Sequence, residues 1–275
     1  ANNSKKPTII SCKTIIGFGS PNKSGKASSH GAPLGEDEIK LVRKKLKWPY
    51  QPFQIPERIL NEWRLIGKKA ANFENDWNKK FFKLNSDFKA EFNNFRNKNF
   101  SDKLKKLVQT QKEKYFNEKP SIATRQCSMM VLEELKSNIP NLIGGSADLS
   151  GSNNTKTKSS NVINSKNFKG NYIHYGVREH GMAGAMNGIA LYDNLVPYGG
   201  TFLIFSDYCK PSIRLSALMK LRVIYVFSHD SIGLGEDGPT HQPIEQLTGL
   251  RSIPNIKVFR PADMSETLES WEAAL

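Results

Sequence analysis

The sequence lacks any long apolar run, and this absence bears first on membranes. No uninterrupted apolar stretch approaches the roughly 18 residues that a membrane-spanning helix needs. Residues 1–6 are polar and basic and lack the apolar stretch of a secretory signal. The first residue, Ala1, is not a methionine, so we expect that it is not a natural start. With 24% charged and 38% apolar residues, the composition is typical of a soluble globular protein.

Cysteine is scarce, which excludes two kinds of small scaffold. Cys12, Cys127 and Cys209 lie far apart and form no CxxC pair. A zinc knuckle and a disulfide framework are therefore both disfavoured, and a reducing cytoplasm is the expected location. A phosphate-binding P-loop is also missing: five residues separate Gly19 from Gly25 instead of four, and Ala27 stands where that motif needs Ser or Thr.

Acidic residues are outnumbered, which leaves two interpretations of the charge. The 275 residues carry a formal net charge of +14, and residues 79–119 hold twelve Lys or Arg against five Asp or Glu. Such a balance suits either solvated helix faces or contact with nucleic acid and other anions. No recognised nucleic-acid-binding module accompanies the charge, so solvated helices are favoured over a catalytically inactive basic binding protein.

Apolar patterning predicts an α/β fold. Residues 8–16 are rich in β-branched side chains and predict a buried strand, 36–47 predict a helix, and 57–116 predict several helices. After Pro120, strands and helices alternate. Strands are predicted at 141–144, 172–174, near 196, 223–227 and 256–259, and helices at 122–137, 179–192, 206–221 and after 260. This alternation predicts a parallel sheet flanked by helices, with ligands at the carboxyl ends of its strands.

Three loops combine residues that can carry chemistry, but each alone admits a simpler interpretation. Residues 228–243 contain two His, three acids and three Gly, which suits either anion and proton handling or a structural loop. In residues 172–183, Glu179 stands where a strand gives way to a helix, so it could act in a site, cap the helix or pair with Arg178. Residues 142–153 form a strand and a Gly/Ser loop suited to anions or to a simple turn.

Taken together and in this order, the loops resemble the transketolase family. Residues 12–23 and 30–35 are similar to the end of that family's diphosphate-binding domain. Residues 144–149, the stretch around Glu179, and residues 233–243 are similar to its pyrimidine-binding domain. The resemblance implies a thiamine-diphosphate-binding α/β fold in three parts. These are a remnant of the diphosphate-binding domain (1–56), a helical linker (57–120) and a pyrimidine-binding domain cut short at its C-terminus (121–275).

The resemblance also implies which residues face the cofactor. Glu179 matches the carboxylate that hydrogen-bonds the aminopyrimidine of thiamine diphosphate and promotes its activation. Phe205 matches the ring that stacks on the pyrimidine, with Phe202 and Tyr208 beside it, although their spacing also fits an ordinary helix face. Asp148 matches an acid near the cofactor. The cation of this family, Mg²⁺ or Ca²⁺, is held by a Gly-Asp-Gly motif that would precede Ala1, so no metal ligand is expected in this chain.

Further residues match groups that meet the substrate. Those at the phosphate end are Arg125, Ser152 and His229, and those at the sugar hydroxyls and carbonyl are Asp237 and His241. His30 matches a His that reaches both the cofactor diphosphate and the reacting carbonyl. The resemblance thus implies Glu179, His241 and His30 as catalytic residues.

The implied activity is ketol transfer between sugar phosphates of the xylulose 5-phosphate and ribose 5-phosphate class, in the pentose phosphate pathway. A homodimer with its active site between subunits is implied as well. The chain departs from the family at Ala27, where a second His is usual, and at His180, where an aromatic residue is common. Dihydroxyacetone synthase and deoxyxylulose-phosphate synthase are the nearest alternatives, and residues 236–243 favour transketolase over the latter.

Overall fold

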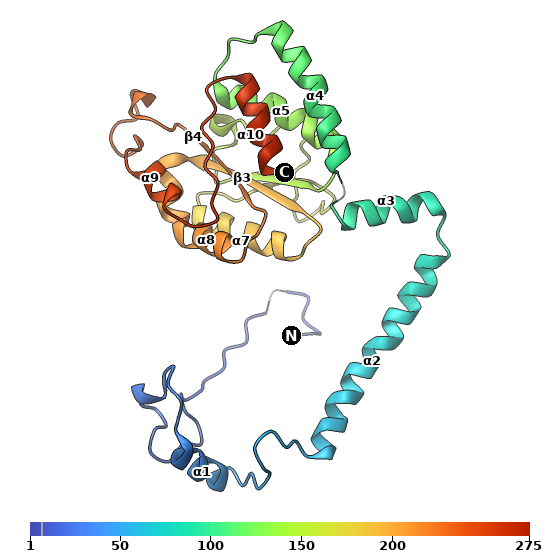
Figure 1. Cartoon of the computed structure of the whole chain (residues 1–275), viewed down its shortest axis with the longest axis vertical. Helices are drawn as coiled ribbons and strands as arrows, with labels where there is room; N and C mark the ends of the chain where they lie inside the picture. The colour runs from blue at the N-terminus through green and yellow to red at the C-terminus, as the bar shows by residue number, and fades with distance from the viewer. Residues whose placement is uncertain (7, 99) are drawn as a thin grey trace. The chain divides into compact units, whose positions relative to one another are not determined.

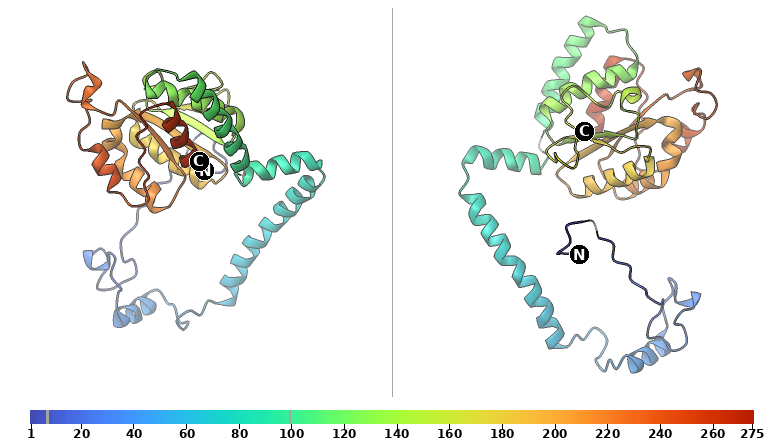
Figure 2. Two further views of the ribbon diagram at one scale, coloured as in Figure 1. Left: turned by 45° about the horizontal axis from the view of Figure 1, so that its top comes forward. Right: turned by 180° about the vertical axis from the view of Figure 1, so that it is seen from behind.

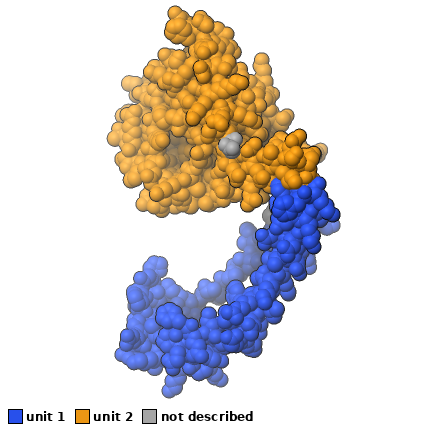
Figure 3. Space-filling view, turned by 45° about the vertical axis from the view of Figure 1, so that its right-hand side comes forward, with its two compact units in different colours: residues 1–83 blue, residues 84–275 orange. Residues whose placement is uncertain are grey.

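The chain divides into two compact units, residues 1–83 and 84–275, which Figure 3 colours separately. The computed structural model describes residues 1–6, 8–98 and 100–275. Each unit is a separate body, and the second contains the sheet.

The first unit contains two α-helices, a short 3-10 turn and loops. Its elements are η1 (Ala27–Ser29), α1 (Glu36–Lys45) and α2 (Glu57–Phe82). The predicted helix at 36–47 is confirmed as α1, whose first turn is acidic and whose last turn is basic, as the helix dipole favours. In the described part of this unit, the buried polar side chains are Ser20 and Glu38, which hydrogen-bond to each other.

The strand predicted at residues 8–16 is wrong. Residues 8–15 have no regular structure, and Ile9 and Ile10 are 95% and 71% exposed. β-branched composition favours extended backbone, but a strand also needs a partner for its N–H and C=O groups, and no ladder in the described residues includes this segment.

The second unit follows the predicted alternation. Its helices are α3 (Ser86–Arg96), α4 (Ser101–Glu118), α5 (Thr124–Asn138), α6 (Ser150–Asn153), α7 (Glu179–Leu191), α8 (Ser206–Leu218), α9 (Gln246–Arg251) and α10 (Met264–Ala274). Its strands are β1 (Leu142–Ser146), β2 (Tyr172–His174), β3 (Val196–Phe202) and β4 (Ile224–Ser228), with the short turns η2 (Leu203–Phe205) and η3 (Ile232–Leu234). The several helices predicted over 57–116 are confirmed as α2, α3 and α4.

The four strands form one parallel sheet in the order β2-β1-β3-β4. Helices α5 and α10 cover one face and α7 and α8 the other, as the views of Figures 1 and 2 agree. On the first face the Tyr198 and Trp271 rings meet edge to face, and the Trp271 indole donates to Ser128 at 3.0 Å. The predicted class, a parallel sheet flanked by helices, is confirmed.

Helix α7 packs against β3 where the strand has glycine. The strand is buried along its whole length, and a side chain on Gly199 would collide with the sulfurs of Met182 and Met186. Glycine on the strand therefore makes room for the methionine side chains of α7. This packing fixes the first residue of α7, Glu179, beside the carboxyl end of the sheet.

The strand predicted at residues 256–259 is also wrong. Ile256 and Val258 pack, partly buried, against the core cluster under α8, but the segment makes no ladder among the described residues. The apolar side chains of this segment are partly buried by packing, and packing does not require backbone hydrogen bonds to a neighbouring strand. The division expected at 1–56, 57–120 and 121–275 stays a prediction. Helix α4, which it assigns to the linker, packs Leu104 and Val108 into the core of the second unit.

The strand order places a crevice between β1 and β3. The chain passes from β1 outward to β2 and then returns to the other side of β1 as β3. In open parallel sheets, ligands bind where the order reverses in this way, outside the carboxyl ends of the strands. The loops that follow β1, β2 and β3 all begin at this edge.

Candidate active site

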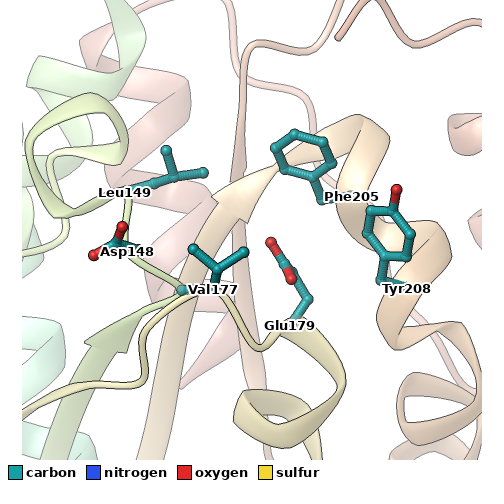
Figure 4. Close-up of a pocket in the computed structure, with 7 residues that line it drawn as sticks. Asp148, Leu149, Val177, Glu179, Phe205 and Tyr208 are labelled. Carbon is teal, nitrogen blue, oxygen red and sulfur yellow. The ribbon is translucent and has the colours of Figure 1, made fainter. Parts of the chain in front are cut away.

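A cavity of about 480 Å³ opens at this switch point (Figure 4). The segments that line it follow three different strands. They are Ala147, Asp148 and Leu149 after β1, Val177 and Glu179 after β2, and Phe205 and Tyr208 after β3. The lining is mainly apolar and aromatic, with two carboxyl groups.

Glu179 is the buried carboxylate of the cavity. Its side chain is 9% exposed, and Figure 4 shows the carboxylate pointing into the space between Val177 and the Phe205 ring. In residues 100–275, which hold every neighbour of this cavity, no side-chain hydrogen bond or ion pair reaches it. Arg178 donates instead to the carbonyl of Tyr175 at 2.9 Å. The two structural interpretations of Glu179, a capping side chain and a partner of Arg178, therefore do not describe it.

Aromatic rings form a continuous stack beside the cavity. The rings of Phe202 and Phe205 lie 5.7 Å apart and nearly parallel, and Tyr208 stacks on Phe205 at 5.9 Å. His229 stacks on Phe202 at 3.8 Å, and the His241 ring meets Phe205 edge-on at 5.3 Å. Five residues predicted from separate motifs are thus brought into one cluster. Its flat apolar surfaces suit a planar heterocycle.

His229 carries the most perturbed electrostatics of the cluster. It follows β4 directly and has a left-handed backbone, with φ of 54°. Burial lowers the pKa of His229, the positive charge of Arg125 lowers it further, and Asp237 and Asp230 oppose the shift. The His229 ring is therefore neutral near pH 7. Arg125 lies close enough to this ring for its positive charge to disfavour protonation of the imidazole. Arg260 binds the Asp230 carboxylate at 2.7 Å and so secures the start of this loop.

The remaining predicted residues differ in how closely they approach the cavity. Asp148 lines it from the β1 side, exposed and with φ of 63°. Ser152 is half-buried on α6, and Asp237 is exposed in the loop after β4. His30 is exposed and belongs to the first unit, residues 1–83.

Sequence reasoning missed the apolar walls and a buried polar support. Val177 and Leu149 line the cavity, and the buried side chain of Asn153 donates to the Ser228 hydroxyl at 2.6 Å. Val177 stands two residues before Glu179, a spacing that could have suggested a shared surface. The contact between Asn153 and Ser228 spans 75 positions and has no signal in a single sequence.

The described residues contain neither a membrane-spanning helix nor a cluster of metal ligands. No helix of the part that the structure describes is long and apolar enough to cross a membrane. Within residues 1–6, 8–98 and 100–275, no three side chains among His, Cys, Asp and Glu gather as a metal site would require.

Comparison with known proteins agrees with this geometry. Residues 120–275 match the family model described as the transketolase pyrimidine binding domain, and residues 1–104 match the transketolase thiamine diphosphate binding domain. Over 278 residues the chain is 50% identical to the transketolase of Buchnera aphidicola subsp. Schizaphis graminum, covering 98% of this chain and 41% of that protein.

Solved transketolase structures share the fold. That of Campylobacter jejuni aligns with a TM-score of 0.83 at 38% identity over 99% of this chain and 41% of its own. That of Pichia stipitis in complex with sedoheptulose 7-phosphate aligns with a TM-score of 0.76 at 37% identity, over 94% and 39%. The chain thus spans about two fifths of the length of the relatives it matches.

Fold and site define an α/β cofactor-binding domain whose cavity presents one buried carboxylate to an aromatic stack. The two matched domain models specify the cofactor class as thiamine diphosphate. The chain belongs to the transketolase family.

Proposed function

We propose that the chain forms the aminopyrimidine side of the active site of a transketolase. The observation that carries the proposal is the Glu179 carboxylate, buried and without a partner in the described protein, facing the Phe205 ring across an apolar cavity. An aminopyrimidine would complement this cavity, because its planar ring could stack on Phe205 and its polar edge could hydrogen-bond the Glu179 carboxylate. The residues present therefore fit the cofactor.

Each residue of the cavity has a distinct task in this proposal. Glu179 hydrogen-bonds the pyrimidine edge and holds or releases a proton there. Phe205 stacks on the ring, with Phe202 and Tyr208 supporting it, while Val177 and Leu149 exclude water. Thiamine diphosphate, when bound, supplies the carbon nucleophile of ketol transfer. The Glu179 carboxylate faces an open cavity instead of a partner among the described residues, and this arrangement supports a functional reason for it.

The substrate side follows from the cluster around His229. Arg125 and His229 are both proposed to meet a phosphate, since an Arg fork matches a phosphate dianion and a neutral His can donate one hydrogen bond. Ser152 is proposed at the same end. Asp237 and His241 are proposed for the sugar hydroxyls and carbonyl, and His30 for the cofactor diphosphate and the carbonyl. Sugar phosphates as substrates are supported by the relative solved with sedoheptulose 7-phosphate.

We further propose a homodimer with active sites between subunits, and Mg²⁺ or Ca²⁺ held by residues outside this chain. A cytoplasmic location is supported by the three free cysteines, two of them buried and unpaired.

The deciding experiment assays the complete gene product that contains this chain, with thiamine diphosphate and Mg²⁺. Xylulose 5-phosphate with ribose 5-phosphate should be converted to sedoheptulose 7-phosphate and glyceraldehyde 3-phosphate. Preference for pyruvate with glyceraldehyde 3-phosphate would indicate deoxyxylulose-phosphate synthase, and preference for formaldehyde as acceptor would indicate dihydroxyacetone synthase. Inactivity on all three, with salt-sensitive retention on nucleic acid, would favour an inactive basic binding protein.

A further inference from the structure

A chain of hydrogen bonds runs beneath the substrate side of the cavity and ends on His229. The Ser146 hydroxyl, at the end of β1, donates to Asn153 Oδ1 at 3.1 Å. Asn153 Nδ2 donates to Ser228 Oγ at 2.6 Å, and Ser228 Oγ lies 2.9 Å from His229 Nδ1. Ser146 and Asn153 are fully buried, so water does not compete for the bond between them, and Ser228 and His229 are half-buried. Two strand ends and α6 are thereby joined to one imidazole.

The direction of each bond follows from the donors and acceptors available. Ser146 Oγ accepts from the Leu149 amide at 3.1 Å, and its single hydrogen lies within reach of Asn153 Oδ1 and of the Gly200 carbonyl, each at 3.1 Å. The Gly200 carbonyl already accepts from the Ala147 amide at 3.0 Å, which favours donation from Ser146 to Asn153. The Asn153 oxygen accepts from Ser146, so its amide nitrogen faces Ser228 and donates. The Ser228 oxygen is then an acceptor, and its single hydrogen is free for His229 Nδ1. A ring nitrogen that accepts carries no hydrogen, so a neutral His229 carries its hydrogen on Nε2.

The surroundings of His229 keep the ring neutral and fixed. Burial and the charge of Arg125 lower its pKa, and the proximity of His241 acts in the same direction. Asp237 and Asp230 oppose the shift without reversing it. Stacking on Phe202 at 3.8 Å fixes the plane of the ring. The remaining freedom is the tautomer, which the hydrogen-bond chain decides.

We propose that Asn153 and Ser228 are positioning residues that hold His229 as its Nε2–H tautomer, so that it presents a hydrogen-bond donor to an anionic substrate oxygen. The tautomer is a property of the chain alone. Its use toward a substrate phosphate rests on the function proposed above. Without the relay, His229 Nε2 would be bare in part of the molecules and would repel a phosphate oxygen.

The substitution Asn153→Asp tests the direction of the relay with almost no change of shape. A carboxylate cannot donate, so the Ser228 hydrogen turns toward it, and Ser228 Oγ becomes an acceptor for His229 Nδ1–H. The tautomer should reverse. Asn154→Asp is the matched control, because it adds the same charge one residue away, where the side chain donates only to the carbonyls of Gly151 and Ser152.

The readout is solid-state ¹⁵N NMR of the complete gene product labelled at histidine, above the His229 pKa, with His229→Gln to assign the signals. We expect an unprotonated Nδ1 and a protonated Nε2 in the native protein and in Asn154→Asp, and the reverse in Asn153→Asp. If Asn153→Asp does not fold, Ser228→Ala should yield a mixture of tautomers and Ser228→Thr should retain one. A protonated Nδ1 in the native protein, or a tautomer indifferent to all these changes, overturns the proposal.

Kinetics separate this inference from the proposed function. Reversal should raise KM for phosphorylated substrates about tenfold or more, the effect of losing one hydrogen bond to a charged group. Unphosphorylated sugars should be affected less. A reversed tautomer with unchanged KM would support the relay and refute the phosphate contact of His229.

Discussion

Replacing Glu179 by Gln tests the centre of the proposed site. The two side chains have nearly the same shape, so the cavity of about 480 Å³ and its contacts with Phe205 and Val177 should persist. What changes is the ability to exchange a proton with the pyrimidine edge. Because Glu179 has no hydrogen-bond partner in the described part of its unit, no internal network is broken by the change.

The expected loss is in turnover. Removing a positioned proton-transfer group costs roughly 10²- to 10⁴-fold in rate, which corresponds to about 3 to 5 kcal/mol of transition-state stabilisation. The free energy of unfolding should be nearly unchanged, since the two side chains have nearly the same shape and no internal hydrogen bond of the described residues is lost. The assay is ketol transfer from xylulose 5-phosphate to ribose 5-phosphate at saturating cofactor, with the melting temperature measured alongside.

Glu113→Gln is the matched control, because Glu113 is exposed on α4 and lines no part of the cavity. It should leave turnover and melting temperature unchanged. Near-normal turnover of Glu179→Gln would refute the reasoning. A collapse of the melting temperature would show that Glu179 supports the fold and not the chemistry.

Three further changes test other parts of the structure. Phe205→Ala should weaken thiamine diphosphate binding roughly tenfold in calorimetry through loss of the stacking surface, whereas Phe168→Ala, at a 78% exposed ring, should not; equal affinities would contradict the stack. Arg125→Gln should raise KM for phosphorylated acceptors more than it lowers kcat, and equal losses on unphosphorylated sugars would count against a phosphate contact. In the first unit, hydrogen bonds from the Ser20 hydroxyl and from Asn22 lower the pKa of Glu38 from 4.5 to about 2. This stabilisation is complete above pH 4.5 and is lost as pH falls through about 2. The protection of the Asn22 amide, which is its exchange rate relative to the intrinsic rate at each pH, should therefore fall over that range, and Glu38→Gln should abolish this pH dependence.

Most of the second unit could be predicted from local pattern. The strand at Tyr172–His174 and the start of α7 at Glu179 were placed correctly because apolar runs and Gly-rich breaks mark them. The two wrong strands, 8–16 and 256–259, share a cause. Composition reports whether a segment tolerates extended backbone, but a strand exists only where a second strand offers its hydrogen bonds.

The site was predicted in its residues but not in its geometry. The resemblance pointed to Glu179, Phe205, His229 and His241, and the structure brings these four to one edge of the sheet. Spacing alone favoured a capping role for Glu179 over a catalytic one. Only the folded chain reveals that Arg178 bonds to Tyr175 and leaves Glu179 facing an open cavity.

The sequence by itself determined the alternation of strands and helices, the loops that carry the chemistry and the resemblance to transketolase. Each of these depends on a short segment, whose periodicity and motifs can be identified without knowing the rest of the fold. The tertiary structure decided which side chains share a surface, because the strand order β2-β1-β3-β4 brings together loops far apart in sequence. Such long-range contacts create the environment of the Glu179 carboxylate, the aromatic stack and the relay from Asn153 to His229. A local sequence pattern does not predict them.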